Sequence, residues 1–142
     1  MKTKEPDIVD LGNHFRRLGM RFTPQREAVW KLFRDSQRGY SIPEAIEVLK
    51  DQNIGMATVY RTVMALQEIG RLSWVHDQNG DHRYVACKSM HGHPLVCEKC
   101  GRVQEFVSCD LSVLERLLAV ETGFTITGHR LEVLGICPVC QV

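Results

Sequence analysis

The sequence lacks any long apolar run, since no stretch approaches the roughly 18 consecutive apolar residues that indicate a membrane span. It also lacks an excess of one charge: 18 Lys+Arg and 17 Asp+Glu give a net charge of +1, which excludes a disordered polyelectrolyte. No apolar core follows the lysines of residues 1–6, so these residues do not resemble a signal peptide. We therefore expect the 142 residues to form a cytoplasmic protein of one or two small domains, without a membrane partner.

Cysteine is absent from residues 1–86, and all six cysteines lie in residues 87–142. The positive charge is concentrated elsewhere, because residues 16–38 contain seven basic side chains and two acidic ones. Thiols stay reduced in the cytosol, so these cysteines indicate metal binding more than disulfides. The break in composition predicts two domains, residues 1–86 and residues 87–142.

The first part is expected to be helical and to end in a hairpin. Apolar residues at helical spacing predict a first helix that stops at Gly19. Helix N-cap signals at Thr23-Pro24 and at Ser41 to Glu44 predict two more helices, and a fourth is predicted from about Met56 to Ile69. Strand-forming runs on both sides of Asn79-Gly80 predict a two-stranded wing. These elements together make a winged helix-turn-helix.

The second part is expected to alternate strands with one helix. Strands are predicted around Leu95-Val96 and over residues 103–107, a helix is predicted after an N-cap at Asp110, and further strand material lies in residues 124–134. The predicted fold class is therefore α+β, with an N-terminal winged helix and a small C-terminal α/β domain.

Two pairs of cysteines carry the strongest metal-binding signal. Each pair has the spacing Cys-x2-Cys, and the pairs are Cys97 with Cys100 and Cys137 with Cys140. Two thiolates three residues apart can hold one metal ion, and two such pairs complete a tetrahedron. Four soft thiolates suit Zn²⁺ in a closed site, which contributes to folding and not to catalysis. A redox function of the pairs is the alternative interpretation.

Further potential ligands gather between the wing and the first cysteine pair. The segment His91-Gly92-His93 places two imidazoles on one side of an extended chain, soon after the thiol of Cys87. Nitrogen and sulfur donors again favour zinc, so we expect a second metal site. Its candidate ligands are His76, Cys87, His91, His93, Glu105 and His129. Cys109 is interpreted as a buried apolar residue or a spare thiol.

The predicted fourth helix is a candidate for reading DNA. Its outward stripe contains Thr58, Tyr60 and Arg61, and an arginine beside an aromatic residue near a helix N-terminus suits the major groove. The nearby basic residues that would approach phosphates are Arg16, Arg17, Arg21 and Arg26. The partner is then double-stranded DNA, although a solvated helix face is the alternative interpretation of this helix taken alone.

Four segments resemble the ferric uptake regulator family: residues 21–26 (RFTPQR), residues 57–61 (ATVYR), residues 91–101 (HGHPLVCEKCG) and the terminal cysteine pair. The resemblance covers nearly the whole chain. It implies a homodimeric transcription factor, not an enzyme and without a small organic substrate. It also implies a C-terminal dimerisation domain and a hinge metal that sets the angle between the two winged helices, which bind an inverted-repeat operator.

Within that family, the residues are most similar to those of zinc uptake regulators. The histidine that iron- and peroxide-sensing members carry before the third helix is missing, because that stretch reads Arg38-Gly39-Tyr40. The resemblance implies a regulatory zinc ion in addition to the structural one, and its sensing set is His76, Cys87, His93 and Glu105, with His91 as the alternate. It implies a repressor of zinc-uptake genes; an iron- or peroxide-responsive regulator is the alternative.

The resemblance also implies a possible third metal site in the dimerisation domain. His91 and His129 fall on positions that this site uses in many members. The glutamate that usually completes it is replaced by Ser112. The third site is therefore expected to lack its carboxylate.

Overall fold

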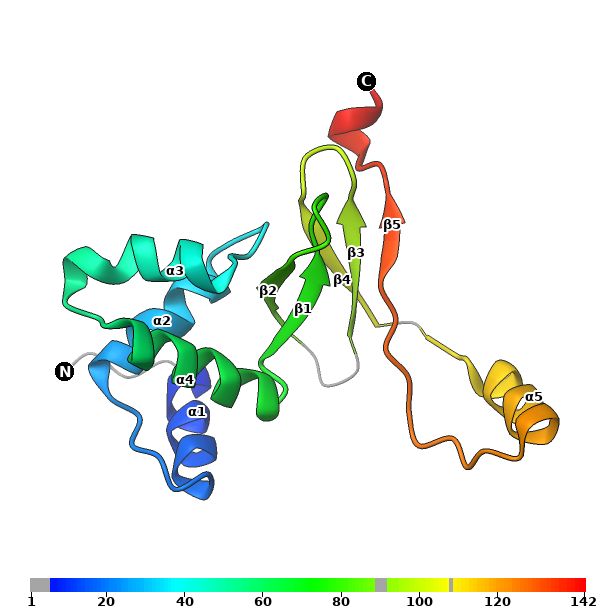
Figure 1. Cartoon of the computed structure of the whole chain (residues 1–142), viewed down its shortest axis with the longest axis horizontal. Helices are drawn as coiled ribbons and strands as arrows, with labels where there is room; N and C mark the ends of the chain where they lie inside the picture. Colours follow the sequence, from blue (N-terminus) through cyan, green and yellow to red (C-terminus); the bar gives the residue numbers. More distant parts are fainter. Residues whose placement is uncertain (1–5, 89–91, 108) are drawn as a thin grey trace.

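The computed structural model describes residues 6–88, 92–107 and 109–142, which Figure 1 shows as a helical part, two small sheets and a separate helix. None of the described helices combines the length and the apolar character that crossing a membrane requires. The helices are α1 (Pro6–Arg17), α2 (Pro24–Arg34), α3 (Ile42–Leu49), α4 (Met56–Glu68) and α5 (Ser112–Thr122), with 3-10 turns η1 (Lys50–Gln52) and η2 (Pro138–Gln141). The strands are β1 (Leu72–His76), β2 (His82–Ala86), β3 (His93–Cys97), β4 (Val103–Phe106) and β5 (Val133–Gly135).

Helices α1 to α4 form around one apolar core, which contains the fully buried side chains of Phe15, Phe33 and Leu66. Local signals set the helix starts. The Thr23 hydroxyl accepts the N–H of Arg26, and Ser41 forms a capping box with Glu44. The wing packs against the same core, so the winged helix-turn-helix that was predicted from the sequence is confirmed.

The wing is the antiparallel pair β1–β2, in which Leu72 pairs with Ala86 and His76 with His82. Its turn is closed by the Asp77 carboxylate, which accepts the N–H groups of Asn79 and Asp81 at 2.8 and 2.9 Å. Gly80 follows in the left-handed region with φ of 80°. The hairpin expected around Asn79-Gly80 is therefore present.

The second sheet has the order β4-β3-β5, with β3 antiparallel to β4 and parallel to β5. Parallel strands end at the same edge of a sheet, so the ends of β3 and β5 lie together. The N–H of Glu98 donates to the Gly135 carbonyl at 2.9 Å and extends this pairing into the two cysteine turns. The topology thus brings together two sequence segments that are about 40 residues apart.

The second sheet shares its buried apolar cluster with the wing. Val75 and Val85 come from β1 and β2, whereas Val96 comes from β3, and Val103 of β4 packs against them. Among the described residues, no buried apolar cluster belongs to the second sheet alone. The position of the wing and the position of the metal-binding half are therefore coupled through side-chain packing.

Helix α5 stands away from both sheets, and two extended segments connect it to them (Figure 1). It has no buried residue, and its N-cap is Leu111; the predicted cap, Asp110, instead accepts the N–H of Ser112 at 3.0 Å. Strand structure was expected from residue 124 onwards but is confined to β5, because within the described chain the segment before it has no strand to pair with. Phe124 in that segment is 72% exposed.

We expect Leu66→Ala to lower the free energy of unfolding by about 2–5 kcal/mol, because it opens a cavity in the packed helical core. Leu66 is 0% exposed, whereas Met56 on the same helix is 68% exposed. Met56→Ala is the matched control and should change stability by less than about 0.5 kcal/mol. Urea unfolding of both variants, followed by circular dichroism, checks this; equal losses would contradict the described packing of α4.

Candidate metal centres and DNA-binding surface

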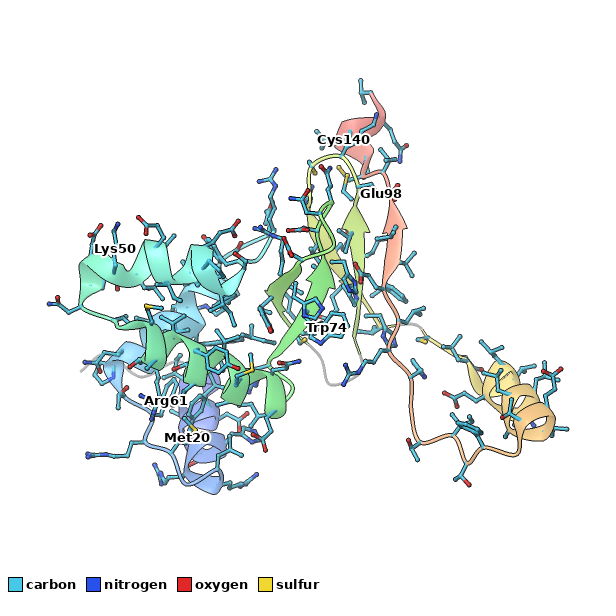
Figure 2. All side chains as sticks on the ribbon, viewed as in Figure 1. Met20, Lys50, Arg61, Trp74, Glu98 and Cys140 are labelled. Atoms are coloured by element: carbon cyan, nitrogen blue, oxygen red, sulfur yellow. The ribbon has the colours of Figure 1, made fainter. Side chains whose placement is uncertain are left out.

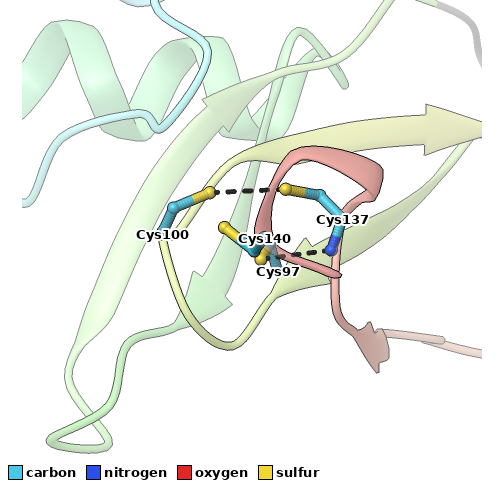
Figure 3. A group of neighbouring side chains, drawn as sticks. All are labelled: Cys97, Cys100, Cys137 and Cys140. Atoms are coloured by element: carbon cyan, nitrogen blue, oxygen red, sulfur yellow. Dashed lines mark hydrogen bonds between the residues drawn. The ribbon is translucent and has the colours of Figure 1, made fainter. Parts of the chain in front are cut away.

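The four cysteines of the two pairs converge at the shared end of β3 and β5 (Figure 3). Their sulfur atoms all lie within 4.8 Å of one another, and the Sγ atoms of Cys100 and Cys137 are 3.8 Å apart. Zn–S bonds of about 2.3 Å in a tetrahedron require S–S separations of about 3.8 Å. The donor set and its spacing therefore fit a closed structural zinc site.

The ionisation of these thiols also favours a cation at this position. Backbone N–H groups, first that of Cys137 and then that of Cys100, point at the Cys97 sulfur and lower its pKa to about 6. In contrast, the neighbouring Cys137 sulfur raises the pKa of Cys140 to about 12. One thiolate forms readily and the last resists ionisation, so a divalent cation between them would offset the accumulated negative charge.

The cysteine turns contact the DNA-binding part of the chain. The Arg38 guanidinium donates to the Cys100 carbonyl at 2.6 Å, and the Gln78 amide donates to the Glu98 carbonyl at 2.7 Å. Between these contacts, a cavity of about 770 Å³ separates the wing from the first cysteine turn. The contacts place the candidate zinc site directly beside the wing.

Three residues of the predicted sensing set, Cys87, His93 and Glu105, line one cavity of about 570 Å³. Burial and the nearby Glu105 carboxylate raise the pKa of the Cys87 thiol to about 11, against the effect of a hydrogen bond with Ser73. The Glu105 carboxylate lies against Gly92, where an added Cβ would come within 1.5 Å of its oxygen. The cavity thus has a thiol from the residue after β2 on one side and a carboxylate from β4 on the other.

His76, the remaining residue of that set, lies at the other end of the wing from Cys87. It pairs with His82, whereas Cys87 follows Ala86, the partner of Leu72. At about 3.3 Å per residue, the two ends of the hairpin are roughly 13 Å apart, too far for two bonds of about 2 Å to one ion. The backbone N–H and ring Nδ1 of His76 instead contact the Glu132 carboxylate at 3.2 and 3.1 Å.

His93 is 6% exposed, and it borders a second cluster as well as the cavity with Cys87 and Glu105. Its Nε2 is 3.2 Å from Nε2 of His129, which is 3.6 Å from the sulfur of Cys109. The alternate ligand His91 lies outside the described residues. His93 therefore lies between the predicted sensing residues Cys87 and Glu105 and the predicted third-site residue His129.

Sequence reasoning missed three residues that contact the predicted histidine ligands: Cys109, Glu115 and Glu132. Each is brought to its partner by tertiary contacts across 14 to 56 residues, with no short motif around it. A thiol soon after β4 was the one available signal for Cys109. For the two glutamates, we find no signal in the sequence.

The predicted DNA-reading residues lie on the first turns of α4. Tyr60 is 54% exposed, Arg61 is exposed and Thr58 is half-buried. Figure 2 shows Arg61 on the same side of the helical part as Met20, and a cavity lined by Met20 and Thr58 connects α4 with the loop after α1. Of the predicted phosphate-contacting residues, three are exposed and Arg26 is half-buried: Arg16, Arg17, Arg21 and Arg26.

This combination of a winged helix and cysteine-rich metal centres agrees with comparisons to known proteins. The sequence profile of the ferric uptake regulator family matches residues 17–134. The match covers most of the chain, which therefore belongs to this family. Membership makes it a metal-responsive transcription regulator and not an enzyme.

Individual relatives differ in the signal for which they are named. The ferric uptake regulation protein of Campylobacter jejuni is 31% identical over 128 residues, which cover 87% of this chain and 81% of that protein. The peroxide-responsive repressor PerR of Staphylococcus aureus is 31% identical over 128 residues, covering 89% and 86%. A solved zinc uptake regulator complexed with zinc and DNA shares the fold, with a TM-score of 0.76, 24% identity and coverage of 99% and 97%.

We expect Cys140→Ser to remove one zinc ion per chain and to lower the thermal unfolding temperature, because the tetrahedral donor set loses one thiolate. Val139, between the two cysteines of the same turn, is 72% exposed. Val139→Ser introduces the same side chain nearby and should keep both the zinc and the stability. Native mass spectrometry with thermal unfolding measures both; full zinc retention in Cys140→Ser would refute the assignment.

Proposed function

We propose that this protein is a zinc-responsive transcription regulator, mainly a repressor, that binds inverted-repeat operators of zinc-uptake genes as a metallated homodimer. The observation that supports it best is the thiol of Cys87 beside the carboxylate of Glu105, at the junction between the wing and the second sheet. A thiolate in a regulatory site favours Zn²⁺ over ferrous iron, which prefers nitrogen and oxygen donors. The histidine expected of iron and peroxide sensors before Ser41 is absent as well.

The hinge site of this proposal draws its ligands from both halves of the chain. Cys87 directly follows β2 of the wing, and Glu105 lies in β4. His93 lines the same cavity, but its Nε2 also lies 3.2 Å from Nε2 of His129, and His76 contacts Glu132. We therefore propose His91, the alternate of the predicted set, as the nitrogen ligand. Bound zinc would supply the positive charge that favours a thiolate beside the half-buried Glu105 carboxylate. Cys87 then loses its proton, and the end of the wing becomes fixed to β4.

Fixing the wing would set the position of α4 relative to the metal-binding half, because wing and second sheet share a buried cluster. In this proposal Thr58, Tyr60 and Arg61 enter the major groove, and the arginines near α1 and α2 contact phosphates. A shift from 1:99 to 99:1 in favour of the DNA-binding conformation requires about 5.5 kcal/mol of differential metal binding.

We propose that a second copy of this chain packs against α5 in the dimer. Side chains on α5 expose apolar surface that a single chain leaves uncovered, with Leu117 at 55% and Val113 at 62% exposure. Leu114 and Leu118 on the same helix are 50% and 41% exposed. Several exposed apolar residues gathered on one helix are typical of an interface. Two copies related by twofold symmetry would also match the two halves of an inverted repeat.

We expect Zn²⁺, added to chelator-treated protein, to switch on binding to a labelled inverted-repeat operator, as followed by fluorescence anisotropy. Cys87→Ser should lose this response because it removes the hinge thiolate. At saturating zinc, Arg61→Ala should weaken binding by about 1–3 kcal/mol, through loss of a base contact. Lys50→Ala, at an exposed basic residue after α3 that is away from the hinge cavity, is the control and should bind normally.

Anaerobic titration with Fe²⁺ separates this proposal from its alternative. If Fe²⁺ alone switches on operator binding, the iron- or peroxide-responsive interpretation replaces the zinc one. The 31% identity to relatives named for iron and peroxide makes this comparison necessary. If neither metal switches on binding, metal-dependent DNA recognition itself is refuted.

We expect the wild-type protein to sediment as a dimer of 16.2 kDa chains and Leu117→Asp to sediment as a monomer, because a charge is placed on the apolar face of α5. Val48 on α3 has a similar exposure of 46%. Val48→Asp is therefore the control and should stay dimeric. Sedimentation equilibrium measures the mass of each variant, and a dimeric Leu117→Asp would exclude α5 from the interface.

A further inference from the structure

Three potential metal ligands converge from segments that are separate in the sequence. His93 begins β3, Cys109 lies between β4 and α5, and His129 lies between α5 and β5. Their ligand atoms all lie within 4.8 Å of one another. His93 is buried, with its ring packed on Phe106 at a centroid distance of 5.6 Å, and the other two are half-buried. The cluster is thus a built site inside the fold and not a chance contact on the surface.

The spacing within the cluster is that of ligands around one ion. Zn–N bonds of about 2.05 Å and Zn–S bonds of about 2.3 Å in a tetrahedron require N–N separations of about 3.3 Å and N–S separations of about 3.6 Å. The Nε2 atoms of His93 and His129 are 3.2 Å apart, and Nε2 of His129 is 3.6 Å from the Cys109 sulfur. Both distances match the edges of such a tetrahedron.

A carboxylate fixes one of these histidines in the form that a metal requires. Glu115, in the first turn of α5, has its Oε1 2.8 Å from Nδ1 of His129. When the Nδ1–H group donates a hydrogen bond to this carboxylate, the lone pair of the ring is on Nε2, which faces Cys109 and His93. Carboxylates that orient metal-binding histidines in this way are a general feature of zinc sites.

We propose that Cys109 supplies a thiolate ligand to a zinc ion that is also bound by His93 and His129, with Glu115 as the positioning residue of His129. The thiolate takes the place of the carboxylate that Ser112 does not provide. This ligand set contains sulfur, so it selects soft and borderline metals over manganese and ferrous iron. This proposal depends on the proposed function only in naming zinc as the bound metal.

The site would also hold together the two segments that connect α5 to the second sheet. Cys109 and His129 are 20 residues apart and lie on either side of α5. Joined through one ion to His93, they anchor both connecting segments of α5 to β3. The loop that carries the exposed apolar face of α5 would then be closed at its base, which lowers the entropy that a second copy has to overcome on binding.

The test uses Co²⁺ in a full-length Cys87→Ser protein that keeps zinc in its four-cysteine site. Of the six cysteines, four are then held by zinc and one is replaced, so Cys109 is the one thiol left. We expect added Co²⁺ to produce a near-ultraviolet thiolate-to-cobalt charge-transfer band, with the zinc content unchanged at one per chain. Absence of this band in Cys87→Ser would overturn the proposal, even if no further variant folded.

Further substitutions in the Cys87→Ser protein identify the ligands. Cys109→Ser should abolish the charge-transfer band, whereas Ser112→Ala is the control and should keep it. Glu115→Gln should keep the band but weaken cobalt binding by about 10- to 100-fold, since it disturbs only the orientation of His129. A band that persists in Cys109→Ser, or a Glu115→Gln variant with unchanged affinity, would contradict the assigned ligand and its positioning residue. These readouts need no DNA, so failure here is separate from failure of the proposed regulator.

Discussion

The parallel pairing of β3 with β5 is the contact on which the metal-binding half of the protein depends. It places Cys97 and Cys137 at one end of the sheet and brings His129 back to β3 at the other end. Non-local strand pairing is entropically unfavourable in a short chain, and this sheet has few buried apolar residues with which to offset the entropy. Thiolates held by one cation would supply a large part of the missing stability.

The same scarcity of apolar residues explains why metal binding and DNA binding are linked physically. The second sheet buries Val96 against Val75 and Val85 of the wing, so neither element can turn without disturbing the other. The hinge thiol of Cys87 directly follows the wing. A ligand that fixes this junction therefore acts on a packed two-part cluster and not on a flexible linker, which is the type of bistable contact that transmits a binding event.

The sequence predicted what local signals determine, namely the capped helices α2 and α3, the wing at Asn79-Gly80 and the two cysteine turns. It could not predict which ligands meet. His76 and Cys87 were predicted to bind one ion, yet the register of the hairpin puts the two at opposite ends. Packing across the sheet sets the register, and the number of residues between two positions does not reveal it. The partnership of Cys109 with His129 likewise arises from the return of the chain after α5.

Helix α5 shows what a single chain leaves incomplete. Its apolar side chains are exposed. Glu115 connects it to the rest of the described chain through a hydrogen bond with His129. A helix of 11 residues is marginal in water without tertiary packing. Two contacts would support its helical structure: the one between Glu115 and His129, and the proposed packing of a second copy on Leu114, Leu117 and Leu118. Because His129 is itself a candidate metal ligand, metal occupancy and dimerisation would stabilise the same helix and would be thermodynamically linked through it.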